Sequence, residues 1–81
     1  MDASTSAVTI AAPDLLRRGL ILWNDSTATC YVKFGSAASN TSFTWRLTTQ
    51  SGYELPIPVY IGEITAVWES ATGSMQVTEL F

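Results

Sequence analysis

The groups with which this 81-residue chain could do chemistry are seven carboxylates and one thiol, because the sequence contains no histidine. A serine or cysteine nucleophile normally needs an adjacent base, and imidazole is the usual one. A glycosidase needs two carboxylates that face each other across a cleft, and no two carboxylates here are close in sequence. The common zinc sites need several thiols or imidazoles. The sequence therefore predicts a protein that is not an enzyme and that binds no metal or cofactor.

The thiol belongs to Cys30, which lies on the apolar face of an alternating segment. Free cysteine is among the most buried residue types, so we expect Cys30 to be a packing residue. One cysteine cannot form an intrachain disulfide. A chain of this length is marginally stable without such a cross-link, which favours oligomerisation or docking on a larger partner.

Aromatic and basic residues are better candidates for a binding surface. Tyr31 is out of phase with the apolar face of its segment, and Tyr53 and Tyr60 flank a Pro-Ile-Pro stretch. Tyrosine offers a large contact area with a polar tip at a low entropic cost. The predicted partner contacts are Trp23, Tyr31, Tyr53 and Tyr60 as anchors, with Arg17, Arg18 and Arg46 as charges at the rim. The same aromatic residues would also suit a stacking platform for a sugar.

The elements that must position these residues are short β-strands, because apolar residues recur with a period of two. Residues 29–34 and 42–47 alternate most clearly, and weaker strands are predicted at residues 7–11, 19–24, 63–68 and 74–80. The side chains predicted to point inward are Cys30, Val32, Phe34, Phe43, Trp45, Leu47 and Trp68. Residues 19–24 are apolar on both faces, which indicates either a central strand covered on both sides or one face of an interface.

Turn-forming clusters separate these segments at intervals of roughly 8–12 residues, the spacing of a sandwich or barrel. The predicted fold is all-β, a small antiparallel β-sandwich or barrel of about six to seven short strands. Residues 14–18 could begin a helix, and a β continuation is an equal alternative. We expect residues 1–12 to form an N-terminal arm that could include a first short strand, and residues 13–81 to form a single β domain.

The composition points to a protein that works in contact with others. Charged residues make up 14% of the chain, against about 25% in a typical soluble domain.

With four basic residues and a net charge of −3, the chain lacks a basic surface that could follow a phosphate backbone, so we expect no direct contact with nucleic acid. Neither a signal peptide nor an apolar run of about 20 residues is visible, so we expect synthesis in the cytosol and no membrane contact.

Several stretches of the chain are similar to those of a family of small virion proteins of tailed bacteriophages. They are residues 17–26 (RRGLILWNDS), 30–35 (CYVKFG) and 53–56 (YELP), followed by Ala66-Val67-Trp68, Gly73 and residues 77–80 (VTEL). The similarity covers about residues 15–81. It is a likeness of overall pattern, and it brings no catalytic residue with it.

The resemblance implies a structural part of a phage particle that is made in the host cytoplasm. We favour a capsid decoration (cement) protein, which would bind the outside of the assembled shell, contact the major capsid protein or other virion proteins, and form a homo-oligomer. A component of the tail, neck or baseplate would look much the same. A small carbohydrate-binding β module is the third alternative.

Overall fold

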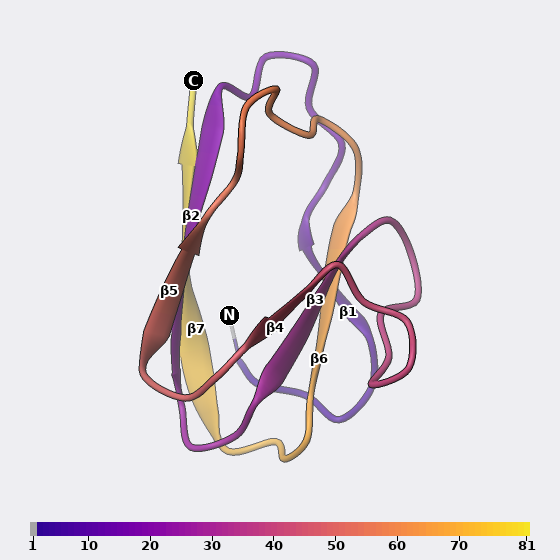
Figure 1. Cartoon of the computed structure of the whole chain (residues 1–81), viewed down its shortest axis with the longest axis vertical. Helices are drawn as coiled ribbons and strands as arrows, with labels where there is room; N and C mark the ends of the chain where they lie inside the picture. The colour runs from indigo at the N-terminus through magenta and orange to yellow at the C-terminus, as the bar shows by residue number, and fades with distance from the viewer. Residues whose placement is uncertain (1) are drawn as a thin grey trace.

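The computed structural model describes residues 2–81 as two antiparallel β-sheets that pack face to face (Figure 1). The seven strands are β1 (Val8–Ala11), β2 (Gly19–Ser26), β3 (Cys30–Phe34), β4 (Trp45–Leu47), β5 (Ser51–Glu54), β6 (Ile64–Trp68) and β7 (Gly73–Leu80). One sheet has the order β1-β6-β3-β4, and the other has the order β5-β2-β7. The prediction of a small all-β sandwich is confirmed.

Strand β2 is the centre of the three-stranded sheet, and its side chains alternate strictly between the two faces. Leu20 and Leu22 are fully buried between the sheets, whereas Ile21 and Trp23 are exposed on the opposite face. Of the two interpretations of residues 19–24, a strand covered on both sides is therefore wrong for the isolated chain. The second face of this strand is open.

The core lies between the sheets and is closed at its lower end by a buried polar network. Cys30, Val32 and Trp68 pack there, as predicted. Asn24 is also fully buried, and its Nδ2 donates to the carbonyls of Ala28, Leu47 and Thr48 at 2.9, 3.0 and 3.2 Å. Its Oδ1 accepts from the indole Nε1 of Trp68 at 3.3 Å and from the hydroxyl of Ser26 at 2.7 Å. One side chain thus joins both sheets and the turns between them, with its polar atoms satisfied.

Two side chains predicted to point into the core, Phe43 and Trp45, are instead about half exposed. Strand β4 has three residues and lies at the edge of its sheet, so Trp45 reaches the open side between the sheets and not the centre. There its ring stacks on Tyr53 of β5, with a centroid separation of 4.7 Å and an interplanar angle of 19°. Phe43 precedes the strand and packs against Tyr31. Leu47 is buried, as predicted.

The N-terminal segment closes the opposite side of the sandwich. The amide of Ala3 donates to the carbonyl of Gly73 at 3.1 Å, and the carbonyl of Ser4 accepts from the amide of Trp68 at 2.8 Å. Strand β1 then pairs with β6. Residues 2–12, which the sequence suggests as an arm, therefore lie along the domain and contact both sheets. Met1 lies outside the described residues.

Figure 1 shows how the connections divide between the two ends of the sandwich. The loop between β1 and β2, the loop between β5 and β6 and the C-terminus lie together at the top of the view. The β2–β3, β4–β5 and β6–β7 turns, each of which passes from one sheet to the other, lie at the bottom. We call the upper end, made of residues 12–18, residues 55–63 and Phe81, the apical end.

Candidate functional site

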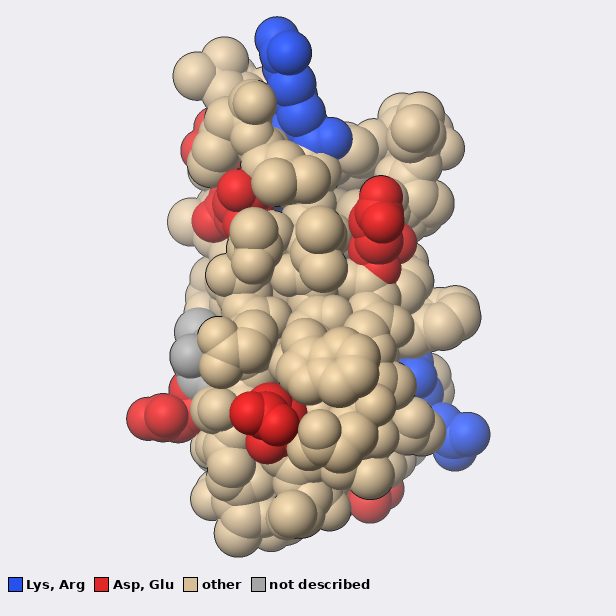
Figure 2. Space-filling view, turned by 90° about the vertical axis from the view of Figure 1, so that its left-hand side faces the viewer, with Lys and Arg blue, Asp and Glu red and all other residues tan. Residues whose placement is uncertain are grey.

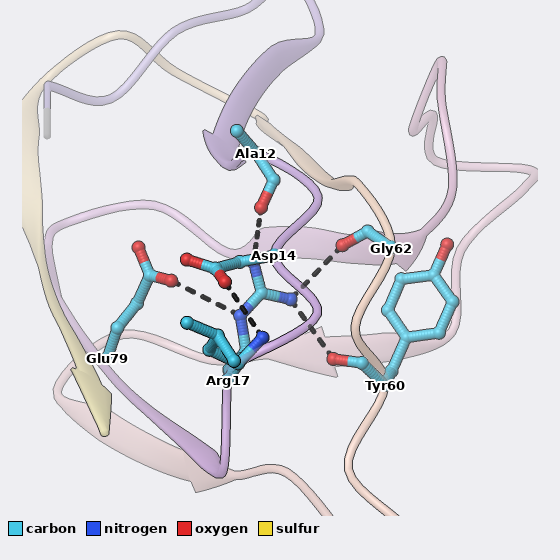
Figure 3. A network of polar contacts seen from close by, with 7 residues as sticks. Ala12, Asp14, Arg17, Tyr60, Gly62 and Glu79 are labelled. Atoms are coloured by element: carbon cyan, nitrogen blue, oxygen red, sulfur yellow. Dashed lines mark hydrogen bonds and ion pairs between the residues drawn. The ribbon is translucent and has the colours of Figure 1, made fainter. Parts of the chain in front are cut away.

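A buried arginine organises the apical end (Figure 3). Arg17 is 3% exposed. Its Nη1 donates to the carbonyls of Tyr60 and Gly62 at 3.0 and 3.1 Å, and its Nη2 donates to the carbonyl of Ala12. Its Nε forms an ion pair with Glu79 Oε2 at 3.2 Å. We call this group the Arg17 clasp, because the planar guanidinium holds both apical loops and the end of β7 together.

The clasp fixes a turn that places leucines in solvent. The amide of Leu16 donates to Asp14 Oδ1 at 2.9 Å, and the amide of Arg17 donates to the carbonyl of Asp14 at 3.2 Å. The amide of Asp14 in turn donates to the carbonyl of Ile61 in the other apical loop at 2.8 Å. Residues 14–18 therefore form a turn and not a helix. Leu15 and Leu16 are 84% and 75% exposed at its tip.

The second apical loop presents another apolar side chain. Ile57 lies between two prolines, with a cis bond to Pro58, and is 92% exposed. Proline restricts the backbone, so this side chain is displayed on a stiff loop. The apical end thus carries Leu15, Leu16 and Ile57 in solvent on loops that the Arg17 clasp joins.

An apolar stripe runs from the middle of the three-stranded sheet towards the apical end. It consists of Trp23, Ile21 and Leu80, each between 42% and 45% exposed. Two glycines make room for the larger members. A Cβ at Gly52 would lie 3.1 Å from the indole of Trp23, and a Cβ at Gly19 would lie 3.1 Å from Leu80 Cδ1. The ring and the leucine therefore lie flat against the sheet.

The face that carries the stripe has few charges. The residues that lie opposite Ile21 in the register are Glu54 on β5 and Thr78 on β7, and those opposite Trp23 are Gly52 and Gln76. Directly opposed residues of an antiparallel pair share a face. Figure 2 shows this side of the molecule as largely uncharged, with a few separate acidic and basic side chains.

Three of the predicted anchors pack against the protein itself. Tyr31 is nearly covered and donates from its hydroxyl to Glu69 Oε1 at 2.6 Å, which raises the pKa of Tyr31. Tyr53 stacks on Trp45, and Tyr60 stacks on Phe34 with a centroid separation of 5.0 Å. Much of the surface of these three side chains is therefore in contact with the chain itself and is not available to a partner.

The remaining predicted contacts divide between surface and interior. Trp23 is exposed on the open face, Arg18 is exposed at the apical end, and Arg46 is exposed opposite Tyr31 on the other sheet. Arg17 is not a rim charge, because the clasp uses its charge inside the domain. Sequence reasoning missed Ile21, Leu80 and the apical side chains. Two features of the sequence could have revealed them. Ile21 is apolar although it alternates with the buried leucines of β2, and the Pro-Ile-Pro stretch places an isoleucine in a loop.

The outer side of the four-stranded sheet holds a shallow groove of about 430 Å³. Tyr31 on β3 and Val67 and Trp68 on β6 contribute from the sheet, Glu69 follows β6, and the rest of the lining comes from the N-terminal segment and the β3–β4 loop. Its polar groups are mainly hydroxyls and one carboxylate. The groove is less apolar than the stripe, and its Tyr31 and Glu69 already bond to each other.

The groups that could hold a metal or act as a nucleophile do not converge in the described part of the chain. No three carboxylate or thiol side chains cluster among residues 2–81. Burial raises the pKa of the Cys30 thiol to about 12, so it is protonated at neutral pH. Within the same residues, no helix is long and apolar enough to cross a membrane.

Comparisons of this chain with known protein families, with curated protein sequences and with solved structures find no match.

Proposed function

We propose that the chain is a structural protein of a phage particle, and specifically a decoration protein that binds and braces the assembled capsid. The observation that carries the proposal is the apolar stripe of Trp23, Ile21 and Leu80 on a sheet face with few charges. Such a face suits the desolvated centre of a protein interface, where aromatic residues are enriched and charges are depleted. The resemblance to small virion proteins supplies the kind of particle.

The size of the stripe indicates how such a protein would bind. Covering a half-exposed apolar side chain contributes on the order of 1 kcal/mol, so three contribute about 3–4 kcal/mol. Association itself costs more than this. One copy that used the stripe alone would therefore bind weakly, and the exposed leucines and isoleucine of the apical end would have to add contacts. A repeating shell compensates further, because many linked contacts give avidity.

The first test is the copy number of the protein in purified virions, measured by quantitative mass spectrometry against the major capsid protein. A count comparable to that of the shell protein supports the decoration role. A much smaller count would move the protein to the tail, neck or baseplate. Absence from particles would overturn the virion proposal, and a carbohydrate-binding module would then be tested on a glycan array.

A matched pair of substitutions tests the surface. Trp23→Ser should lower the occupancy of the protein on capsids at least about tenfold, because tryptophan anchors commonly contribute 2 kcal/mol or more at interfaces. Trp45→Ser removes an equally exposed indole from the seam between the sheets, and it should leave occupancy unchanged once the folded fraction is matched. Equal losses for the two variants would contradict the assignment of the stripe.

A further inference from the structure

The free edge of β7 differs from the other three sheet edges in having little protection against strand pairing. Natural proteins protect edges with short strands, bulges, prolines or charged side chains. Strand β1 has four residues with a register shift between Thr9 and Ala11, β4 has three residues and includes Arg46, and β5 has four residues and ends at Glu54. Strand β7 has eight residues, with no proline, no lysine and no register shift against β2.

The one charge on β7 is already compensated inside the chain. Glu79 forms its ion pair with Arg17, so the strand presents little net charge to an approaching edge. The rest of β7 is small, polar or apolar: Gly73, Ser74, Met75, Gln76, Val77, Thr78 and Leu80. The Arg17 clasp therefore removes the feature that would otherwise repel a second strand.

The hydrogen bonds of β7 show which backbone groups face outward. The carbonyl of Gly73 accepts from Ala3, on the side away from β2, whereas the carbonyl of Leu80 accepts from Arg18 on the β2 side. Backbone groups alternate in direction along a strand. The backbone N–H and C=O groups of the odd-numbered residues of β7 therefore point to the free edge. The N-terminal segment covers the start of that edge, and no described residue gives a backbone partner to Val77 or Glu79.

We propose that this edge pairs with the same edge of a second copy of the chain, antiparallel and across a two-fold axis at Thr78. In that register Val77 of each copy faces Glu79 of the other. The backbone N–H and C=O groups of these residues then form about four hydrogen bonds between the two copies. Neither glutamate lies opposite the other, and Thr78 faces its own symmetry mate. The described part of the N-terminal segment pairs with Gly73 and Ser74, away from Val77 and Glu79.

Self-pairing would join the two three-stranded sheets into one continuous six-stranded sheet. The exposed face of β7 is the same face that carries Ile21 and Trp23. The two apolar stripes would then lie on one side of a single sheet, and this doubles the apolar face that a dimer presents to a larger partner. The inference does not rest on the virion role, and it can hold or fail independently of it.

Disulfide trapping of the purified full chain tests the register. At the two-fold axis, opposed residues form a non-hydrogen-bonded pair with Cα atoms about 4.5 Å apart, which a disulfide can span. Thr78→Cys should therefore cross-link under mild oxidation. Gln76→Cys is the matched control, because it is exposed on the same face while its symmetry mate lies about 13 Å away along the strands. The native Cys30 is buried and does not compete.

We expect Thr78→Cys to form covalent dimers at least about tenfold faster than Gln76→Cys. Equal rates would indicate random collision and would overturn the proposal, and faster trapping of Gln76→Cys would overturn the register. Sedimentation equilibrium gives a second readout. The unsubstituted chain and Gln76→Lys should dimerise with rising concentration, and Thr78→Lys should stay monomeric because two lysines would face each other.

Monomeric behaviour of the unsubstituted chain up to millimolar concentration would also overturn self-pairing. In assembled particles, cross-linking of the Thr78→Cys variant to another virion protein, without a homodimer, would assign the β7 edge to that protein instead. These outcomes are separate from the copy-number test. A dimer of the isolated chain can form whatever its place in a particle, and a capsid-bound protein can fail to self-pair.

Discussion

Replacing Arg17 by alanine should lower the free energy of unfolding by about 3 kcal/mol. The side chain is buried, and its guanidinium bonds three backbone carbonyls and the carboxylate of Glu79. Alanine removes these donors and leaves the carbonyls of the two apical loops without their partners. The two loops and the end of β7 lose the group that joins them.

The magnitude follows from how each partner is placed. Breaking a buried ion pair by removing one partner typically costs 3–5 kcal/mol. The side chain of Glu79 is 32% exposed, so water compensates part of its loss and the lower end of that range applies. A domain of this length has a total stability of roughly 4–12 kcal/mol. The substitution therefore removes a large fraction of it and should lower Tm by about 15 °C.

Urea titration followed by tryptophan fluorescence measures the change, and Arg18→Ala is the matched control. Arg18 is adjacent in sequence and exposed, so its loss should change stability by less than about 0.5 kcal/mol. Arg17→Lys should fall between the two, because a single ammonium cannot reach all the carbonyls that the planar fork reaches. A loss below about 1 kcal/mol for Arg17→Ala, or one equal to that of Arg18→Ala, would refute the clasp.

Four further substitutions test the fold. Gly73→Ala should destabilise the protein by about 2–3 kcal/mol, because φ is +96° and the new Cβ would lie 2.7 Å from Ser26 Cα. Gly35→Ala, with φ of +142° and no atom nearer than 3.9 Å, should cost only about 1 kcal/mol, and equal losses in urea titration would contradict this reasoning. Asn24→Leu should cost about 3 kcal/mol, measured by calorimetry, because it leaves buried carbonyls unpaired. Burial raises the pKa of Cys30 to about 12, so its contribution is complete below about pH 9 and is lost as the pH rises towards 12, by up to about 1.4 kcal/mol per pH unit. Cys30→Ala should show a flatter decline of stability with pH over that window, and an unchanged slope would contradict it.

Much of the sandwich was predictable because its strands carry their own signal. The alternation of Cys30 and Val32, and of Ile64, Ala66 and Trp68, places these side chains on one face whatever the strand order. These properties depend on neighbours in the sequence, so the sequence was sufficient to reveal them.

Tertiary structure decided which surfaces remained free. Trp45 has the phase of a core residue, and it is exposed because β4 lies at a sheet edge beside β5. Arg17 was predicted as a charge at the rim of a contact surface. It is buried because the carbonyls of Tyr60 and Gly62 and the carboxylate of Glu79, all far away in the sequence, converge on it. Trp23 is accessible because, among residues 2–81, no third layer covers β2. The period of the apolar residues and the charge of a residue can be found from neighbouring positions in the sequence. Sheet edges, packed layers and carbonyls that converge on one side chain exist only after strands far apart in the sequence have paired.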